Sequence, residues 1–301
     1  MIDFFRRVLS MPYALRRMEA RINDLLILEA RLLINKFDYT TTPERISDFE
    51  FKVFSQWGDD GIIQFLINKL GITEKRFIEF GIENYRESNT RFLLMNNNWD
   101  GLVFDGSQKN IQIVQRDDIY WRYNLKAECA FITVENIKSL LEKNNFNGRV
   151  GLLHIDVDGN DYWVWKAMDN SDADIVIMEY NALFGDERAI TIPYNPHFSV
   201  ADAHYSRVYF GASLAALQQL SEEKGYYFIG CNSAGNNAYF IHNRHFGKLK
   251  SLSVKEGFVM SKSRQTRNKS GQLDFLDPVQ ALQQLKGMPV INTSTGETES
   301  L

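Results

Sequence analysis

Short apolar runs alternate with helix-spaced apolar positions over residues 51–249 of the 301-residue chain. The runs predict β-strands, and the spacing of three and four predicts helices that each bury one face. A strand followed by a helix recurs about five times, which is typical of an open, mostly parallel α/β sheet with helices on both faces. Ligands of such a sheet bind at the carboxyl ends of its strands. The predicted strands are 76–80, 102–105, 120–125, 150–155, 174–179, 226–230 and 238–242, and the predicted helices are 58–70, 87–97, 108–116, 134–144, 161–168 and 207–224.

Residues 1–37 show a different pattern, with apolar side chains at helical spacing and basic residues between them. This segment holds seven basic and four acidic residues, a net charge of +3. We therefore expect an amphipathic N-terminal helix that mediates homo-oligomerisation or lies on an anionic membrane surface. The alternative is a helix packed on its own domain. The apolar positions are Leu15, Met18, Ile22, Leu25, Leu26, Leu28, Leu32 and Leu33.

The segments on either side of the alternating region lack its pattern. Residues 38–50 read as a linker, rich in threonine and holding Pro43. Residues 250–301 read as a partly disordered C-terminal extension. Within it, Lys262–Lys269 is basic and polar, Val279–Leu285 predicts a short helix, and Thr293–Leu301 is expected to be disordered.

Composition excludes several classes of protein. Hydrophobic residues make up 44% and charged residues 24%, which is ordinary for a globular domain. A net charge of −4 argues against a nucleic-acid partner, and two cysteines are too few for a disulfide scaffold or a zinc ribbon. No secretory signal is recognisable, and no apolar stretch reaches the ~18 residues of a spanning helix. We expect a cytoplasmic protein, with residues 1–37 as a peripheral contact to the inner face of the membrane.

Two neighbouring predicted strands each end on an acid. The first ends on Glu79, followed by Gly81, and the second ends on Asp105. In a parallel sheet these acids meet at one edge, where Gly81 allows close backbone approach and Asp105 can accept both hydroxyls of a ribose. The pattern predicts a nucleoside site. A complete G-x-G-x-x-G is absent, which argues against nicotinamide or flavin.

A second acidic group follows the strand at 150–155. It comprises Asp156, Asp158 and Asp161, and the next strand ends on Glu179. Crowded carboxylates repel unless cations or hydrogen bonds offset their charge. We expect Asp156, Asp158 and Glu179 to hold Mg²⁺ or Mn²⁺, or a carboxylate or His154 to act as a general base. The alternatives are that Asp158 is a turn residue, that Asp161 is a helix cap, and that His154 is buried by strand alternation.

Four blocks of sequence stand out between about Phe54 and His242. They are Ser55-Gln-Trp-Gly-Asp-Asp-Gly61, Phe77-Ile-Glu-Phe-Gly81 with Glu87-Ser-Asn-Thr90, Trp99-Asp-Gly-Leu-Val-Phe-Asp105, and His154-Ile-Asp-Val-Asp-Gly-Asn-Asp161. Together these blocks resemble the FkbM-type methyltransferase family. The resemblance implies a Rossmann-like, seven-stranded sheet of order 3-2-1-4-5-7-6, S-adenosylmethionine as cofactor, and methyl transfer to a hydroxyl of a sugar or natural product.

Compared residue by residue, the resemblance gives a set of expected cofactor-binding residues and one position at which this chain differs from the family's usual sequence. The departure is Glu83-Asn84-Tyr85, where the family usually places a second glycine and this chain has bulkier residues. The expected cofactor-binding residues are Glu79, Gly81, Ser88, Asn89, Asp105, Ser107 and Asp156.

Three functions follow as hypotheses. The leading one is an O-methyltransferase for a sugar or glycosylated product, in which Asp156, Asp158 or His154 assists catalysis. The second is a metal-dependent glycosyltransferase, which would hold a sugar nucleotide through Asp156-Val157-Asp158. The third is a catalytically silent assembly protein that recruits partners through residues 1–37, and the altered turn motivates it.

Overall fold

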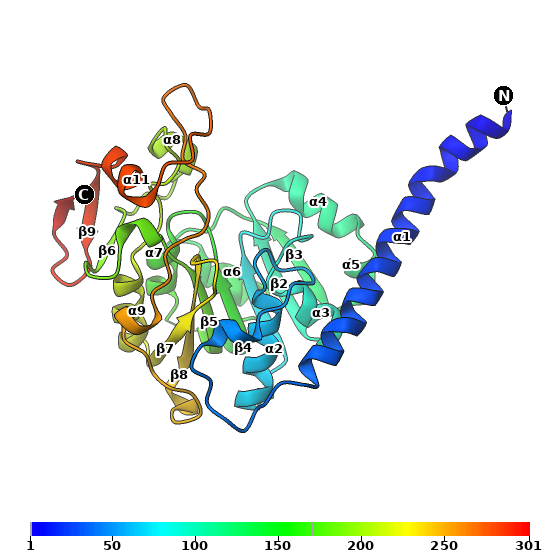
Figure 1. Ribbon diagram of the computed structural model, residues 1–301, viewed down its shortest axis with the longest axis horizontal. Coiled ribbons are helices and arrows are strands. Elements are labelled where there is room, and N and C mark those ends of the chain that lie inside the picture. Colours follow the sequence, from blue (N-terminus) through cyan, green and yellow to red (C-terminus); the bar gives the residue numbers. More distant parts are fainter. Residues whose placement is uncertain (1, 170) are drawn as a thin grey trace.

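The computed structural model describes residues 2–169 and 171–301, and a seven-stranded sheet lies at its centre (Figure 1). The strand order is β3-β2-β1-β4-β5-β8-β7. The first five strands in this order pair in parallel, while β5–β8 and β8–β7 are antiparallel. Because β6 belongs to another sheet, the seven strands numbered among themselves have the order 3-2-1-4-5-7-6. They are β1 (Arg76–Phe80), β2 (Asp100–Asp105), β3 (Leu125–Cys129), β4 (Gly148–Ile155), β5 (Ser171–Glu179), β7 (Tyr226–Cys231) and β8 (Asn237–His242).

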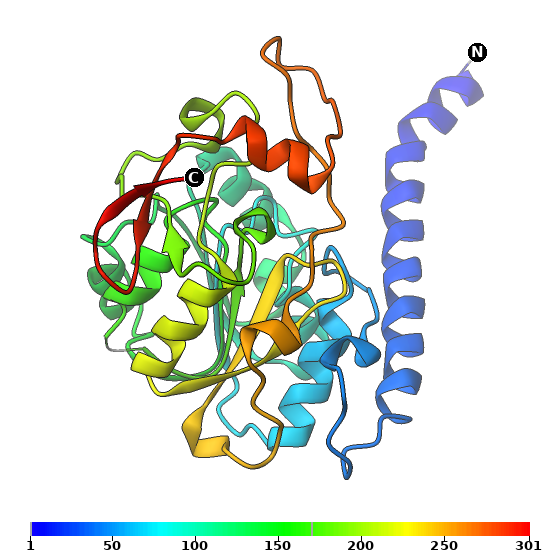
Figure 2. The same ribbon diagram turned by 60° about the vertical axis from the view of Figure 1, so that its left-hand side comes forward.

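Helices cover both faces of this sheet because successive strand residues point to opposite sides. Phe77 and Leu152 pack on one face, and Ile78 and Leu153 on the other. The expected Rossmann-like arrangement is therefore present (Figure 2). The first face carries α2 (Asp59–Leu70), α3 (Arg91–Asn97), α4 (Gln108–Arg116) and α5 (Ile119–Arg122), and the second carries α6 (Ile137–Lys143), α7 (Asp161–Ala167), α9 (Leu214–Glu223) and the short α10 (Val254–Gly257).

Three predicted elements differ from the structure. Residues 119–122 form α5 instead of a strand, since Asp117 accepts a hydrogen bond from the Ile119 amide, and β3 begins only at Leu125. Residues 87–90 form a turn ahead of α3. The helix predicted at 207–224 begins at Leu214, after the Ser213 side chain caps it. Aromatic and apolar residues in these stretches fit either element, so polar contacts decide which forms.

The C-terminal residues are ordered, contrary to the expectation of a partly disordered extension. They form α11 (Pro278–Gln284), β9 (Pro289–Asn292) and β10 (Thr298–Ser300), and β9 pairs with β6 (Ile190–Thr191). Arg188 holds Glu299 at 2.6 Å. An apolar cluster closes beneath this second sheet, so residues 250–301 are an integral part of the domain. The cluster comprises Phe184, Ile190, Ile192, Val208, Tyr209, Leu285 and Val290.

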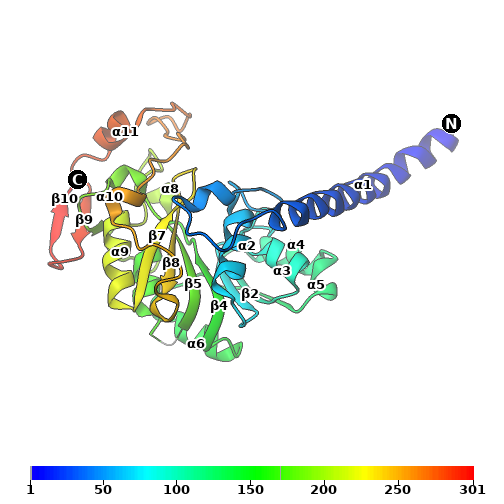
Figure 3. The same cartoon turned by 60° about the horizontal axis from the view of Figure 1, so that its bottom comes forward.

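Helix α1 (Ile2–Ile34) packs on the domain only near its C-terminal end and otherwise projects away from it (Figures 1 and 3). Ile27 and Ala30 are buried against Phe54 and Phe92. Residues 38–50, the expected linker, include η1 (Ile46–Phe49), whose Phe49 ring stacks on α2. Homo-oligomerisation and contact with a membrane surface remain predictions. None of the described helices is long and apolar enough to cross a membrane. Exposed apolar residues of α1 are Leu15, Met18, Ile22, Leu25, Leu28, Leu32 and Leu33.

The end of β1 passes unusually close to the end of β4. Gly81 has φ of +72°, and a Cβ atom there would lie 1.7 Å from the carbonyl oxygen of Asp156. Only a residue without a side chain fits, because both backbones are fixed by the pairing of β1 with β4. This close contact lies at the carboxyl edge of the sheet, where the candidate site is found.

Gly81→Ala is expected to lower the free energy of unfolding by more than about 3 kcal/mol, the upper range for single substitutions. Gly71→Ala is the matched control, since Gly71 has φ of +64° and nothing lies within 4 Å of an added Cβ. The control should lose only about 1–2 kcal/mol of left-handed strain. Urea unfolding measures the free energy of unfolding of both variants. Equal decreases would contradict the steric overlap between a Cβ at residue 81 and the carbonyl oxygen of Asp156.

Candidate functional site

Two cavities open at the carboxyl edge of the sheet. The first, here the β1–β4 cavity, has a volume of about 380 Å³, and the second, the β5 cavity, about 260 Å³. These volumes are close to the lower end of the range of small-molecule pockets. The β1–β4 cavity is lined by Gly81, Phe104, Asp105, Gly106, Ala130, Phe131, Ile132, Asp156, Val157, Asp158, Asn160, Phe198, Ser199, Val200 and Ala201.

Four of the predicted residues line this cavity together: Gly81, Asp105, Asp156 and Asp158. They come from the ends of β1, β2 and β4, which meet because these strands are parallel neighbours. The apolar side chains opposite them provide a surface for a flat ring. A cavity with acids on one side and apolar groups on the other suits a nucleoside.

Asp105 is placed to accept hydrogen bonds from a ligand. Its Oδ1 accepts hydrogen bonds from the Ser107 amide at 2.7 Å and from Asn110 Nδ2 at 3.0 Å. Its Oδ2 accepts none within residues 2–169 and 171–301. Ser107, predicted to bind the cofactor, instead caps α4 through a hydrogen bond from the Asn110 amide. One oxygen of Asp105 is therefore held by the chain, and the other is left without a partner among the described residues.

Glu79 lies beneath the cavity and does not line it. It is 2% exposed and accepts hydrogen bonds from Ser88 Oγ at 2.5 Å, the Asn89 amide at 3.0 Å and the Thr90 hydroxyl. Burial favours the neutral carboxyl, but the hydrogen bond and charge of His154, with the hydroxyl donors, outweigh it and lower the pKa of Glu79. Glu79, Ser88 and Asn89, which were predicted to bind the cofactor, therefore hold the turn after β1 in place and do not line the cavity.

His154 does not fit the predicted role of general base. Its Nδ1 lies 3.0 Å from Glu79 Oε1, and its Nε2 lies 3.2 Å from Asn89 Nδ2. The residue is 4% exposed, so neither nitrogen faces a cavity. Burial lowers its basicity, yet the hydrogen bond and charge of Glu79 raise the pKa of His154 overall. His154 is a positioning residue that ties β4 to the β1 turn.

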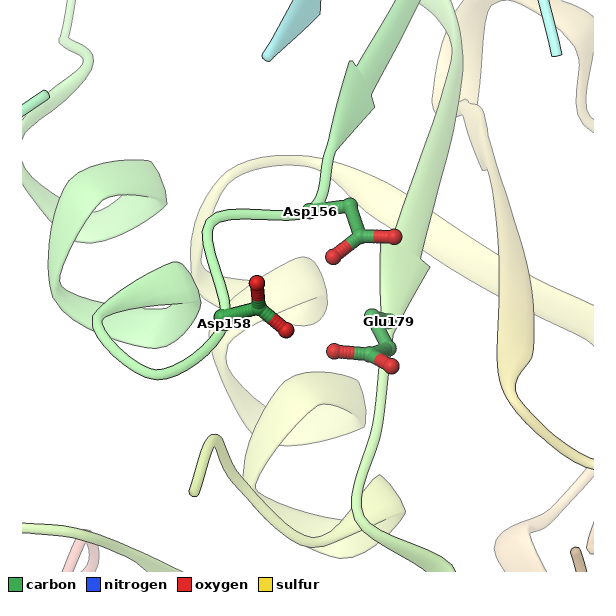
Figure 4. A group of neighbouring side chains, drawn as sticks. All are labelled: Asp156, Asp158 and Glu179. Atoms are coloured by element: carbon green, nitrogen blue, oxygen red, sulfur yellow. The ribbon is translucent and has the colours of Figure 1, made fainter. Parts of the chain in front are cut away.

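Asp156, Asp158 and Glu179 form a cluster in which one oxygen from each lies within 4.8 Å of the others (Figure 4). Asp156 and Asp158 line the β1–β4 cavity, whereas Glu179 lines the β5 cavity. This carboxylate cluster therefore stands between the two cavities. Glu179 Oε2 is buried and accepts no hydrogen bond from any described residue.

Removal from water and the crowding of like charges perturb this cluster. Partial burial, followed by the charge of Asp158, raises the pKa of Asp156 to about 8. Burial and the charges of Asp156 and Asp158 raise the pKa of Glu179 well above its usual value. Three carboxylates with an unpaired buried oxygen are hard oxygen donors of the kind that bind Mg²⁺ or Mn²⁺.

The loop between β4 and α7 aims Asp158 at the cluster. Asp161 is fully buried, and its carboxylate accepts hydrogen bonds from the amides of Val157 at 2.8 Å and Gly159 at 2.9 Å. Asp161 is the first residue of α7 and not its cap, which is Asn160; its carboxylate instead holds the loop ahead of the helix. Asp158 has φ of +55°, a left-handed conformation that aspartate tolerates better than most residues. Asp158 is therefore both a turn residue and a member of the cluster.

The departure at Glu83-Asn84-Tyr85 does not narrow the β1–β4 cavity. Tyr85 is fully buried in the core beneath α2 and α3, and its hydroxyl lies 2.9 Å from Thr90 Oγ1. Positive φ angles at Glu83 and Tyr85 turn the chain away from the cavity. None of the three residues lines it.

Sequence reasoning missed several cavity residues. Phe131 and Ile132 follow β3, which was predicted five residues too early, so the end of that strand was misplaced. Phe198 comes from the long connection after β5 and packs over Gly159, where a Cβ would lie 2.3 Å from its ring. The length of that connection indicated that it covers the carboxyl edge of the sheet. The length did not identify which of its residues would line the cavity.

Comparisons with known proteins give weak likenesses. No protein-family model matches the chain, and no curated protein matches it. Among solved structures, it is similar to the N-terminal domain of EvdMO1 with SAH bound, at 12% identity and a TM-score of 0.40, over 63% of this chain and 81% of that one.

Two other solved structures are similar at the same level. A S-adenosylmethionine-dependent methyltransferase from Clostridium acetobutylicum shares 10% identity at a TM-score of 0.40, over 73% of this chain and 98% of that one. The O-methyltransferase from Bacillus cereus in complex with SAH shares 11% identity at a TM-score of 0.39, over 72% and 89%. Likenesses this weak support no function, which has to be inferred from the site itself.

The carboxylate cluster predicts a pH dependence of stability. Because folding raises the pKa of Asp156, its stabilising contribution is complete below the unfolded value of about 3.9 and is lost as pH rises through about 8. With a chelator present, the free energy of unfolding should fall between about pH 6 and 8, by up to about 1.4 kcal/mol per pH unit for each proton concerned.

Asp156→Asn should flatten this fall, and Asp118→Asn, at an exposed carboxylate paired with Arg122, should leave it unchanged. Denaturant unfolding at several pH values measures the slope. An identical slope for the wild-type protein and Asp156→Asn would show that Asp156 ionises normally.

Proposed function

We propose that this protein is a S-adenosylmethionine-dependent O-methyltransferase that acts on a hydroxyl of a sugar or glycosylated product. The observation that carries the proposal is the carboxylate cluster between two cavities at the carboxyl edge of the sheet. One cavity has the features of a nucleoside site, and the other offers space for an acceptor. The sequence resemblance to FkbM-type methyltransferases supports the same assignment.

The cofactor fits the β1–β4 cavity by the chemistry of its residues. Asp105 Oδ2 would accept the ribose hydroxyls, and Phe131, Ile132 and Val157 would cover the adenine ring. Asp156 and Asp158 would lie near the cationic sulfonium end. When bound, S-adenosylmethionine supplies an electrophilic methyl group.

The chain's own residues would place the acceptor and remove its proton. An acceptor hydroxyl in the β5 cavity would lie beside Glu179. A carboxylate of the cluster would accept the proton of that hydroxyl as its oxygen takes the methyl group that the bound cofactor would supply. Asp156 and Asp158 are the candidate catalytic residues.

A divalent cation is the alternative way to promote deprotonation. Asp156, Asp158 and Glu179 would hold Mg²⁺ or Mn²⁺, and the buried Glu179 Oε2 that lacks a hydrogen bond supports this use. When bound, such an ion would lower the pKa of the acceptor hydroxyl.

Neither alternative function gains support from the geometry. A glycosyltransferase would use Asp156-Val157-Asp158, but it assigns no role to Asp105, which lines the same cavity. The silent assembly protein was motivated by the altered turn, and Tyr85 points into the core instead of the cavity.

Calorimetric titration with S-adenosylmethionine tests the proposal. The full-length protein is expected to bind one equivalent, with and without Mg²⁺. Asp105→Ala should weaken binding by about tenfold or more, since a hydrogen bond to a charged group contributes about 1.5–3 kcal/mol. Asp118→Ala removes an exposed carboxylate outside the cavities and serves as the control. Absence of heat at high protein concentration would contradict the proposal.

The metal is tested separately by titrating Mn²⁺ and recording the paramagnetic resonance signal of the free ion. One ion per chain is expected, and Glu179→Gln should weaken its binding by about tenfold or more, because one charged ligand is lost. Glu187→Gln, at an exposed carboxylate outside the cluster, is the matched control. Equal Mn²⁺ affinities of the two variants would contradict a metal site at Glu179. A carboxylate would then be the remaining candidate for removing the hydroxyl proton.

A further inference from the structure

The β5 cavity is built by segments that are far apart in the sequence. Its walls are the end of β5, the turn between β7 and β8, the residues ahead of α2, and the stretch from Met260 to Ala281. Hydrogen bonds hold these walls together. The Tyr180 hydroxyl donates to the Val259 carbonyl at 2.5 Å, and the Lys262 amide donates to the Ala234 carbonyl at 2.8 Å. The cavity is therefore a fixed feature of the fold.

Charge is distributed unevenly around this cavity. Among the described residues that line it, two are charged: Glu179, which belongs to the carboxylate cluster, and Arg264. Arg264 is exposed and makes no ion pair or hydrogen bond with any described residue. Residues 262–269 carry four basic side chains, and no acidic residue occurs between Glu256 and Asp274. One side of the cavity is thus anionic and another is cationic.

The remaining lining combines an aromatic face with unpaired amides. Trp57 is 40% exposed at the cavity, beside Gln56. The side chains of Gln56 and Gln265 make no hydrogen bond within residues 2–169 and 171–301. Phe210 and Met260 add apolar surface. A flat indole face with amides around it matches a sugar ring, which has apolar C–H faces and polar hydroxyls at its rim.

We propose that the β5 cavity binds the acceptor as a sugar that carries an anionic group, a phosphate or a carboxylate, which pairs with Arg264. This inference rests on the proposed function and names the class of its acceptor. Trp57 covers the ring, the amides of Gln56 and Gln265 bond its hydroxyls, and the hydroxyl to be methylated lies beside Glu179.

The two charges also fix the direction in which the acceptor enters. An anionic group is repelled by the carboxylate cluster and attracted by Arg264, whose planar guanidinium bonds phosphate or carboxylate through two N–H groups. A hydroxyl is left to face Glu179. A neutral sugar would gain nothing from Arg264 and would lack this orientation, so the charge pair selects against it.

The test measures binding of defined sugars to the full-length protein by calorimetry, with and without saturating S-adenosylhomocysteine. The probes are α-D-glucose 1-phosphate, methyl α-D-glucuronoside and the neutral methyl α-D-glucopyranoside. At least one charged sugar is expected to bind about tenfold tighter than the neutral one. A tighter phosphate or a tighter carboxylate identifies the anionic group.

Arg264→Gln should reduce charged-sugar affinity to that of the neutral sugar, and Trp57→Ala should weaken all three sugars. Lys286→Gln, an exposed basic residue outside the cavity, is the matched control and should change nothing. Equal affinities for charged and neutral sugars, no effect of Arg264→Gln, or no sugar binding at millimolar concentration would each overturn the inference.

Binding of S-adenosylhomocysteine is measured in the same samples and separates the two proposals. If it binds but the charge preference is absent, only the anionic acceptor is excluded. If it fails to bind while Arg264-dependent sugar binding persists, the methyl donor is excluded and the anion site stands.

Discussion

The buried carboxylate of Glu79 is the interaction on which the edge of this sheet depends. A charge at 2% exposure is stable only when its lone pairs are used, and Ser88, Asn89, Thr90 and His154 use them. These partners come from the turn after β1 and from β4. Glu79 therefore joins the turn, β1 and β4 into one unit, which brings Gly81 against Asp156 and leaves Asp156 facing the cavity.

The sequence predicted the location of the site better than the role of each residue in it. Parallel strands end at the same edge, so residues at the ends of β1, β2 and β4 come together there, and Gly81, Asp105 and Asp156 line one cavity. The acid that ends β1, Glu79, does not line it. Whether such an acid faces a ligand or bonds the turn that follows its own strand depends on its hydrogen-bond partners. The periodicity of apolar residues in the sequence does not reveal those partners. Glu79 and His154 lie side by side in neighbouring strands, and each satisfies the other below the cavity.

The C-terminal residues were misjudged for a related reason. They contain no long apolar period, because β9 and β10 are short and α11 buries only a narrow face. Their order comes from partners distant in sequence: β9 pairs with β6 about a hundred residues earlier, and Tyr180 bonds the carbonyl of Val259. A pattern read from local residues has no access to such pairings. This segment supplies much of the β5 cavity, so the C-terminal part of that cavity could not be predicted from the sequence.

If the protein transfers a methyl group as proposed, the charge changes of that reaction give the carboxylate cluster a role. The donor begins with a positive sulfur and ends neutral, while the acceptor oxygen has to give up a proton. Carboxylates beside the donor cavity favour the cationic reactant, and alone they would slow a reaction that consumes its charge. The same groups can take the hydroxyl proton or hold a cation that promotes its loss, so the electrostatic cost to the donor is offset at the acceptor. Arg264 also lines the β5 cavity and carries the opposite charge to this cluster. Under the proposal, an acceptor would match both charges if its anionic group paired with Arg264 and its neutral hydroxyl faced Glu179.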